Sequence, residues 1–176
     1  DINRKELFCV RDRFGIKPFY YMVQNDIFYF GSEAKILFPH LEKKEIDIDS
    51  ISEYLIFQYM LGENTMIKNV KQLLPGQALL IKNSEIKKWV YYDINYKNKY
   101  HYSEEKYIED LQDIINDSID LHITSDVPIS SYNSGGIDSS LISILTNNRG
   151  KLDRMYHGTL TEYEGYNESK YAKTIE

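Results

Sequence analysis

The sequence predicts a mixed protein of two partial domains, an α+β part made of short strands followed by an α/β part. Residues 1–94 contain strand-like runs separated by turn residues, with few helical segments between them. Residues 103–176 instead alternate helix, strand, helix, strand and helix, the order that builds a doubly wound parallel sheet. The polar run between these parts, residues 95–102, is predicted to be a linker.

The first part opens with three runs rich in aromatic and β-branched residues. Asn25-Asp26 separates the second run from the third, and both residue types tolerate the backbone of a tight hairpin turn. The three runs are residues 7–10, 19–23 and 27–30. Residues 33–38 then predict a short helix that Pro39 stops, because proline lacks the N–H of a continuing helix.

Further along the first part, one helix and one hairpin are predicted. Residues 50–61 begin with a serine cap and predict a helix with a buried face, ended by Gly62. Residues 77–82 and 85–91 predict a hairpin around Asn83-Ser84.

The second part begins with an amphipathic helix. Ser103 is its predicted cap and is followed by the acids Glu104 and Glu105, which suit the positive end of a helix. Apolar residues then recur at spacings of three and four and define one helical face: Ile108, Leu111, Ile115 and Ile119. A strand at 127–132 and a helix that ends near Gly150 follow.

Residues 134–140, Ser-Gly-Gly-Ile-Asp-Ser-Ser, lie between that strand and that helix. Gly135 and Gly136 can adopt backbone angles barred to other residues, so a ligand can approach the main chain closely. Ser139 and Ser140 are predicted to open the helix, where free N–H groups attract anions. The loop is therefore predicted to hold phosphate.

A tight turn with a serine cap is the simpler interpretation of the same residues, and for Ser-Gly-Gly alone it is favoured. Asp138 reverses that preference, because an acid inside a phosphate loop indicates a divalent cation between the two negative groups. The Lys of a P-loop and the third Gly of a dinucleotide fingerprint are absent from the loop sequence.

The loop resembles the pyrophosphate loop, S-G-G-x-D-S-S, of the ATP pyrophosphatase superfamily. Residues 125–140 resemble the wider "SDVP…SGGxDSS" segment of glutamine-dependent asparagine synthetases. Residues 11–21, Arg-Asp-Arg-Phe-Gly-Ile-Lys-Pro-Phe-Tyr-Tyr, resemble the "RDRFGIKPLYY" hairpin in the N-terminal-nucleophile glutaminase domain of those enzymes. Shorter similarities to family segments follow in the same order, at residues 31–37, 73–77, 89–93 and 166–172.

The resemblance implies a two-step reaction in a larger parent protein. ATP would adenylate the side-chain carboxylate of aspartate, and ammonia from glutamine would displace AMP. The implied cofactors are ATP and Mg²⁺, and the other implied small-molecule substrates are aspartate and glutamine. The resemblance also allows the parent protein to be a homodimer. The implied ATP and pyrophosphate site comprises Asn133, Ser134, Gly135, Gly136, Asp138, Ser139, Ser140 and Thr159, with Asp138 as the magnesium-linked carboxylate.

Two departures from the family pattern concern the nucleotide pocket. Asn133 replaces a leucine, and the strand at 154–160 reads Arg-Met-Tyr-His-Gly-Thr-Leu in place of "TFSIGF". Two other functions stay open beside the main one. The parent could amidate a different carboxylate, such as a sugar acid or an antibiotic precursor, or the chain could be a non-catalytic nucleotide-binding module.

Composition excludes some classes and argues for others. A net charge of −6 argues against a nucleic-acid partner, and no apolar run approaches the roughly 20 residues that span a bilayer. The single cysteine, Cys9, is predicted to be a buried structural thiol and fits a reducing, cytoplasmic compartment. The four histidines lack metal-ligand spacing, and the charged residues of 11–17 are predicted to be ion-paired around a hairpin.

The ends of the chain also carry an expectation. It begins at Asp1 and stops at Glu176 within a helix-like run, as a fragment of a larger protein would. Such a fragment is expected to have no catalytic residue for glutamine hydrolysis and to be inactive in both half-reactions.

Overall fold

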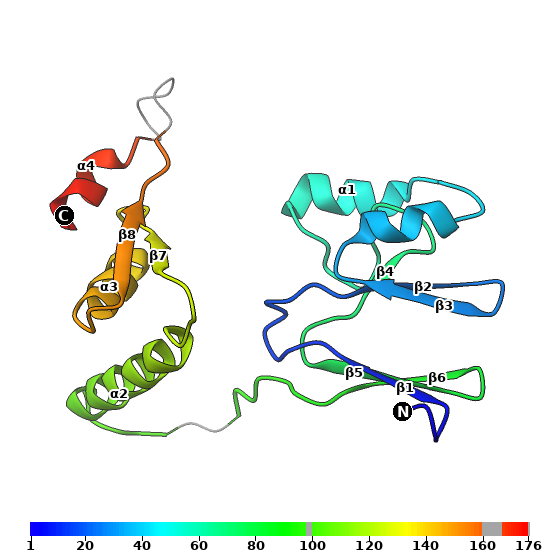
Figure 1. Ribbon diagram of the computed structural model, residues 1–176, viewed down its shortest axis with the longest axis horizontal. Helices are drawn as coiled ribbons and strands as arrows, with labels where there is room; N and C mark the ends of the chain where they lie inside the picture. Colours follow the sequence, from blue (N-terminus) through cyan, green and yellow to red (C-terminus); the bar gives the residue numbers. More distant parts are fainter. Residues whose placement is uncertain (98–99, 160–166, 176) are drawn as a thin grey trace. The chain divides into compact units, whose positions relative to one another are not determined.

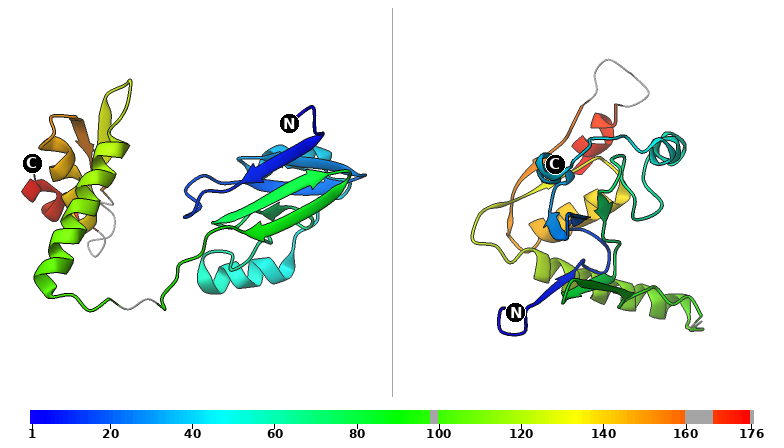
Figure 2. Two further views of the ribbon diagram at one scale, coloured as in Figure 1. Left: turned by 90° about the horizontal axis from the view of Figure 1, so that it is seen from below. Right: turned by 90° about the vertical axis from the view of Figure 1, so that its right-hand side faces the viewer.

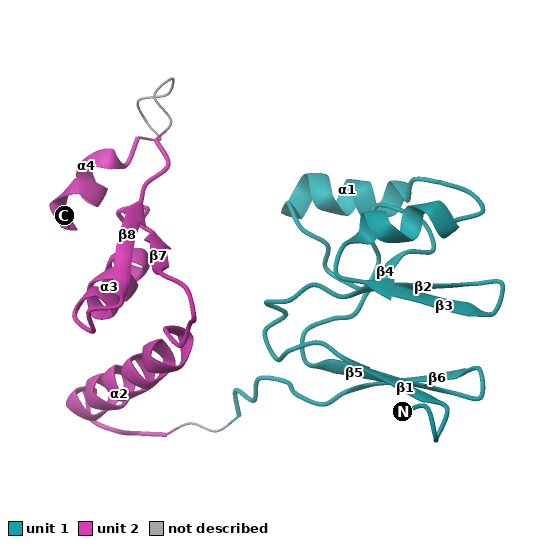
Figure 3. Ribbon diagram, viewed as in Figure 1, with its two compact units in different colours: residues 1–98 teal, residues 99–176 magenta. Residues whose placement is uncertain are grey.

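The computed structural model describes residues 1–97, 100–159 and 167–175, which form two compact units, 1–98 and 99–176 (Figures 1 and 3). Unit 1 is built from antiparallel strands and unit 2 from a parallel strand pair with helices. The mixed α/β class predicted from the sequence is therefore confirmed.

Unit 1 contains two three-stranded antiparallel sheets that stack face to face (Figures 1 and 2). One sheet has the order β1-β5-β6 and the other β3-β2-β4. The strands are β1 (Glu6–Val10), β2 (Tyr20–Gln24), β3 (Ile27–Gly31), β4 (Lys71–Gln72), β5 (Gln77–Lys82) and β6 (Glu85–Val90).

Apolar side chains fill the space between the two sheets. Cys9 of β1 lies opposite Leu79 of β5, and both are buried together with Tyr21 and Leu73. On the other face of β2, Met22 packs against Leu37 and its buried neighbours. Successive residues of a strand point to opposite faces, so Tyr21 and Met22 anchor β2 in two apolar clusters at once.

Both predicted hairpin turns are present, and their residues explain them. Asn25 and Asp26 have φ values of 52° and 58°, and Asn83 and Ser84 have values of 50° and 64°. Two consecutive residues with positive φ form the turn whose twist matches that of the flanking strands. Asparagine and aspartate tolerate this conformation better than other non-glycine residues.

The helices of unit 1 differ from the predicted ones. Pro39 does not stop the first one, because it lies inside a 3-10 helix, η1 (Ala34–His40). The second is α1 (Ile48–Phe57), capped by the side chain of Asp47 and ended at Gln58, which has φ of 62°. Ser50 is therefore not the cap of this helix, and Gly62 does not end it. The predicted buried face is also wrong, since Leu55 and Ile56 are 76% and 73% exposed.

Unit 2 pairs two parallel strands joined through a helix. The strands are β7 (Ile129–Tyr132) and β8 (Leu152–Tyr156), and α3 (Ile137–Asn147) connects them and packs on both. The preceding helix is α2 (Glu104–His122), with Ser103 as its cap, as predicted. The described part of the unit ends with α4 (Ser169–Ala172) and the 3-10 helix η3 (Lys173–Ile175); the predicted strand end at Leu160 and helix start at Tyr166 lie outside the described residues.

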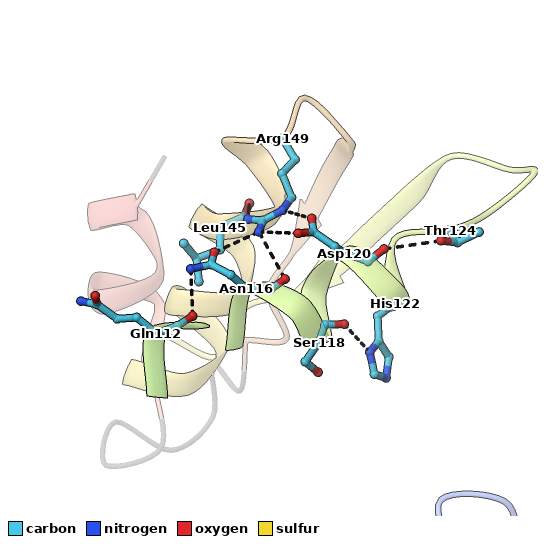
Figure 4. A network of polar contacts seen from close by, with 8 residues as sticks. All are labelled: Gln112, Asn116, Ser118, Asp120, His122, Thr124, Leu145 and Arg149. Atoms are coloured by element: carbon cyan, nitrogen blue, oxygen red, sulfur yellow. Dashed lines mark hydrogen bonds and ion pairs between the residues drawn. The ribbon is translucent and has the colours of Figure 1, made fainter. Parts of the chain in front are cut away.

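A polar network around Arg149 ties the end of α3 to α2 (Figure 4). The guanidinium donates to both carboxylate oxygens of Asp120, at 3.2 Å to Oδ2, and to the backbone and side-chain oxygens of Asn116. It also donates to the carbonyl of Leu145 at 3.0 Å. One side chain thus joins three points on two helices and holds α3 in place behind the loop that precedes it.

Candidate functional site

The candidate site is the loop that leaves the carboxyl end of β7 and enters α3. Beside it, the last residues of β8 end at the same edge, because the two strands run parallel. The backbone N–H of Asn133 donates to the carbonyl of Tyr156 at 2.8 Å and extends the pairing past β7. Ser143 of α3 is fully buried and hydrogen-bonds Ser131 of β7 at 2.9 Å. The edge where parallel strands end is where such sheets bind ligands.

Asn133 is the centre of the loop's hydrogen bonds. Its side chain is buried, and its Oδ1 accepts from the N–H of Gly135 at 2.9 Å and from the hydroxyl of Ser139 at 3.3 Å. The Ser140 hydroxyl also faces this oxygen, at 3.5 Å. An asparagine at this point therefore shapes the loop from inside, which a leucine could not do.

Two serines close the loop onto the first turn of the helix. The Oγ atoms of Ser134 and Ser139 lie 3.0 Å apart, and the N–H of Ser134 donates to Ser139 Oγ at 3.2 Å. The N–H of Gly136 donates to Ser134 Oγ at 3.2 Å. Ser134 is exposed, so its hydroxyl can also reach a ligand.

Only one of the two glycines uses the backbone freedom expected of both. Gly135 has φ of +84°, and a Cβ there would lie 2.8 Å from Cβ of Tyr171 and 2.9 Å from the backbone nitrogen of Ala172. Gly136 has an ordinary φ of −75° and is the N-cap of α3. The helix begins at Ile137, two residues earlier than predicted, and this start places Asp138 in its first turn.

A pocket of about 210 Å³ opens beside the loop. Asn133, Ser134 and Ser139 line it from the loop side, and the remaining lining residues are Tyr132, Tyr156, His157, Gly158 and Glu168. His157 and Glu168 were not predicted as site residues. His157 directly follows β8, so its place at the pocket depends on the strand pairing, which no local sequence pattern reveals.

Three predicted site residues lie differently. Asp138 is exposed and lines a separate groove of about 450 Å³ between α2 and α3, which contains Ile115, Ile119 and Leu141. Thr159 is exposed, and its hydroxyl lies 3.1 Å from that of Ser169. The Ser140 hydroxyl is directed at Asn133. None of these three residues is among the lining residues of the loop pocket, and neither are Gly135 and Gly136.

Within residues 1–97, 100–159 and 167–175, no three His, Cys, Asp or Glu side chains gather as ligands of one metal ion. The helices of the same described ranges include none with the length and apolar character needed to cross a bilayer.

In unit 1, Cys9 is buried, as predicted, with 5% of its surface exposed, and burial raises the pKa of its thiol. The motif that follows it folds differently from the predicted ion-paired cluster. Arg11 donates to the carbonyls of Leu73 and Gly15, while the carboxylate of Asp12 accepts N–H bonds from the turn at 14–17. Those bonds, that of Lys17 first, lower the pKa of Asp12.

No ion pair joins Arg11, Asp12, Arg13 and Lys17 within the described residues, so the predicted ion pairing is wrong. The guanidinium of Arg11 and the carboxylate of Asp12 form hydrogen bonds with main-chain groups and not with each other. The motif is therefore a turn held by hydrogen bonds between side chains and the backbone.

Comparison with known families gives the class of both units. Residues 1–92 match the glutamine amidotransferase domain, and residues 110–176 match asparagine synthase. The chain thus joins these two matched regions in one polypeptide, the first in unit 1 and the second in unit 2.

Individual relatives narrow this class. The chain is 39% identical to the glutamine-hydrolysing asparagine synthetase 1 of Bacillus subtilis over 80% of its length. It is 32% identical over 99% of its length to a candidate asparagine synthetase of Methanocaldococcus jannaschii, and 29% identical over 81% to the amidase chyE of Penicillium rubens. The chain belongs to the glutamine-hydrolysing asparagine synthetase family. It spans 21 to 35% of the length of these relatives.

Proposed function

We propose that the full-length protein amidates the side-chain carboxylate of aspartate, with ATP as the activator and glutamine as the source of ammonia. The observation that carries this proposal is the Ser-Gly-Gly-x-Asp-Ser-Ser string on a turn from a parallel strand into a helix, beside a pocket. Residues 1–94 would be the end of an N-terminal-nucleophile glutaminase domain, 95–102 a linker, and 103–176 the start of a doubly wound synthetase domain.

The proposed chemistry overcomes a poor leaving group. An oxygen of the aspartate carboxylate attacks the α-phosphorus of ATP, and the bond to pyrophosphate breaks. Ammonia then attacks the acyl carbon of the resulting adenylate, and AMP leaves with the bonding electrons. We propose that the hydroxyls of Ser134 and Ser139 and the first N–H groups of α3 would donate hydrogen bonds to the departing pyrophosphate.

The site residues that we propose for this step are those predicted from the sequence, and three of them line the loop pocket. Asn133 shapes the loop, and Gly135 and Gly136 keep the backbone open to phosphate. Ser134, Ser139 and Ser140 supply hydroxyls, while Thr159 is the more distant member, one residue past the pocket-lining Gly158.

Mg²⁺ suits this loop as a companion of the nucleotide. It keeps several waters and is bound through one or two carboxylates together with substrate phosphates. Asp138 is exposed in the first turn of α3 and lies beside the groove between α2 and α3, outside the loop pocket. We propose that its carboxylate would hold the ion, which would offset the charge of the phosphates.

Two alternatives have different support. Amidation of another carboxylate is supported by the segment at 154–160, which departs from the family pattern and of which Tyr156, His157 and Gly158 line the loop pocket. A non-catalytic nucleotide-binding module is disfavoured by the intact loop string. We further propose a reducing cytoplasmic setting, in keeping with one buried cysteine, and a homodimer for the parent.

The test replaces Asp138 with asparagine in the full-length protein and measures ATP–pyrophosphate exchange in the presence of aspartate. Asp138→Asn keeps the shape and removes the charge, so exchange should fall on the order of a hundredfold. The matched control is Asp153→Asn, an exposed aspartate of β8 that pairs only with its neighbour Arg154, and it should leave exchange unchanged. Exchange of the Asp138 variant within a few-fold of the unsubstituted protein contradicts the assigned role.

The acceptor is tested separately with a panel of carboxylates. Aspartate should support the fastest release of pyrophosphate. If a sugar acid or another carboxylate replaces it, the alternative amidotransferase function is correct.

A further inference from the structure

An apolar groove of unit 2 lies between α2 and α3, apart from the loop pocket. Its volume is about 450 Å³, and it shares no lining residue with that pocket. Six aliphatic side chains form its walls: Ile114, Ile115, Ile119 and Ile123 along α2, and Leu141 and Ile142 on α3. Ile114 is 66% exposed and Ile142 is 51% exposed. Contiguous apolar surface of this kind marks a place where another element docks.

The apolar face of α2 continues beyond the groove. Ile108 and Leu111 extend it toward the start of the helix and are 50% and 57% exposed. Between Ile108 and Ile119 this face is about 16 Å long, at a rise of 1.5 Å per residue. A small ligand covers only part of that length, whereas a helix of about eleven residues matches it. The shape therefore favours an amphipathic helix that lays its apolar side chains into the groove.

Acidic residues border the apolar face of α2. The helix contains seven Asp and Glu residues and one lysine, Lys106. Asp110, Asp113 and Asp117 follow one another at spacings of three and four, so they form a row along the helix. Asp110 and Asp117 are neighbours of Ile114 for the same reason, which places the row beside the apolar face.

The charges of this row are largely free. Lys106 pairs with Asp110, at 2.8 Å between Nζ and Oδ1. Asp113 and Asp117 take part in no ion pair in the part of the chain that the structure describes. Asp138, which lines the groove from α3, adds a charge of the same sign. An occupant with basic side chains beside its apolar face is therefore complementary to this surface.

We propose that the groove between α2 and α3 holds an amphipathic, basic helix in the full-length protein, and that this helix belongs to the same polypeptide outside residues 1–176. Its apolar side chains fill the groove, and its basic side chains pair with Asp113 and Asp117. The chain spans 21 to 35% of the length of its relatives, so a full-length protein of their size contains enough further polypeptide to supply the helix. The inference goes beyond the proposed function and does not rest on the reaction.

The coverage of the groove is measured by the labelling of Ile142→Cys with a thiol reagent, followed at this site by mass spectrometry. In the 176-residue chain the site is half exposed and should label fast. In the full-length protein it should label at least about tenfold more slowly, because the groove has to open first. Ser143→Cys, at a fully buried neighbour, should label slowly in both proteins and reports that unit 2 is folded.

The charge of the occupant is tested with two matched pairs of substitutions on α2. Asp113→Lys combined with Asp117→Lys places positive charges beside the groove, so repulsion of a basic helix should reduce the protection of Ile142→Cys severalfold. Glu105→Lys combined with Glu109→Lys makes the same change of charge at exposed positions on another side of the helix. This control pair should leave the protection unchanged.

Three results would overturn the inference. Labelling of Ile142→Cys that is as fast in the full-length protein as in the 176-residue chain would show that the groove is open. Protection that disappears when the protein is diluted would assign the groove to a second copy. Protection that the lysines at 113 and 117 leave unchanged would show that the occupant is not basic. Failure of the aspartate-dependent exchange reaction would overturn the proposed function and leave the labelling result unaffected.

Discussion

Gly135 is the residue of the loop with the least tolerance for change. Its φ of +84° is unfavourable for any side chain, and the space beside it is filled by Tyr171, Ala172 and the carbonyl of Glu168. The backbone of α4 therefore packs directly on the loop where a Cβ would stand. The absence of a side chain at Gly135 is what allows this close packing.

We expect Gly135→Ala to destabilise unit 2 by about 2–3 kcal/mol, combining backbone strain with a backbone clash, and to abolish tripolyphosphate binding. Gly150→Ala is the matched control. Gly150 also has positive φ, +64°, but nothing lies within 4 Å of its added Cβ, so only the strain of about 1 kcal/mol remains. The measurement is the loss of stability of each variant relative to the unsubstituted protein, obtained by thermal unfolding. Equal destabilisation would show that the contact with α4 contributes nothing.

Glu63 is the residue of unit 1 whose ionisation is most strongly tied to the fold. Burial by itself would raise the pKa of this carboxyl, but hydrogen bonds from Lys71 and Lys88 outweigh it and lower the pKa from 4.5 to about 2. Nζ of Lys71 lies 2.7 Å from one carboxylate oxygen, and Lys88 bonds the other. The carboxylate thus bridges β4 of one sheet and β6 of the other.

A pKa that is lower in the folded state gives stability that is complete above the unfolded value and is lost as pH falls through the folded value. Glu63→Gln should therefore lower the melting temperature by a few degrees above pH 4.5, about 1 kcal/mol after allowance for solvent screening. The difference should shrink steadily toward pH 2. Glu45→Gln, in an ion pair that is half exposed, is the control and should change little at any pH. A difference that stays constant down to pH 2 would refute the coupling.

At the scale of elements, the Arg149 network decides how α3 is held. Hydrogen bonding to Arg149 lowers the pKa of Asp120, so this pair is ionised throughout the neutral range. Much of the apolar surface of α2 is exposed, with Ile119 its buried residue, so packing alone holds the helix weakly. The orientation of α3, and with it that of the loop at its start, therefore depends on a polar contact at its far end.

Arg149→Ala should destabilise unit 2 by about 1–2 kcal/mol and speed amide hydrogen exchange in both α2 and α3. Arg149→Lys should recover little, since one ammonium cannot reach the three acceptor sites at once. Arg154→Ala removes an exposed arginine and should leave exchange unchanged. Faster exchange in α3 alone would mean that the network does not couple the two helices.

The sequence predicts correctly those elements whose conformation depends on residues that are neighbours in the chain. The two hairpin turns and the Ser103 cap were identified because Asn, Asp and Ser act through their own backbone neighbours. The bounds of α1 were missed because Asp47 and Ser50 are both good caps and the apolar spacing does not choose between them. The site divides in the same way, since the loop string was visible while His157 reached the pocket through strand pairing. The side of α3 on which Asp138 lies depends on the first residue of the helix. The sequence predicts a start at Ser139, whereas the helix begins at Ile137.

At the scale of the whole molecule, the chain contains one thiol, and its environment is unsuited to catalysis. Cys9 is packed between two sheets against Tyr21, Leu73 and Leu79. A nucleophilic cysteine needs a lowered pKa and access to substrate, and burial gives Cys9 neither.

The 176-residue chain should therefore release no glutamate from glutamine and form no asparagine when ATP, Mg²⁺ and aspartate are added. A thiol reagent should label Cys9 slowly in buffer and fast in denaturant. Labelling in denaturant shows that the reagent is active. Slow labelling in buffer then shows that the fold buries the thiol, which accounts for the absence of turnover. Glutamine turnover that Cys9→Ala removes would show that this thiol is catalytic after all.

The pairing of β1 with β5 also determines the order in which the chain can fold during synthesis. Glu6 of β1 meets Lys82 of β5, 76 positions later, whereas β2 and β3 are adjacent through a two-residue turn. At 5–20 residues per second, a ribosome needs about 4–15 s to make the partner of β1. During that interval Leu7, Phe8 and Val10 lack this partner strand, and unpaired apolar strands are the species that aggregate. Among the described strands of unit 1, β1 is thus the one that waits longest for its partner, and a nascent-chain chaperone would need to shield it during that time.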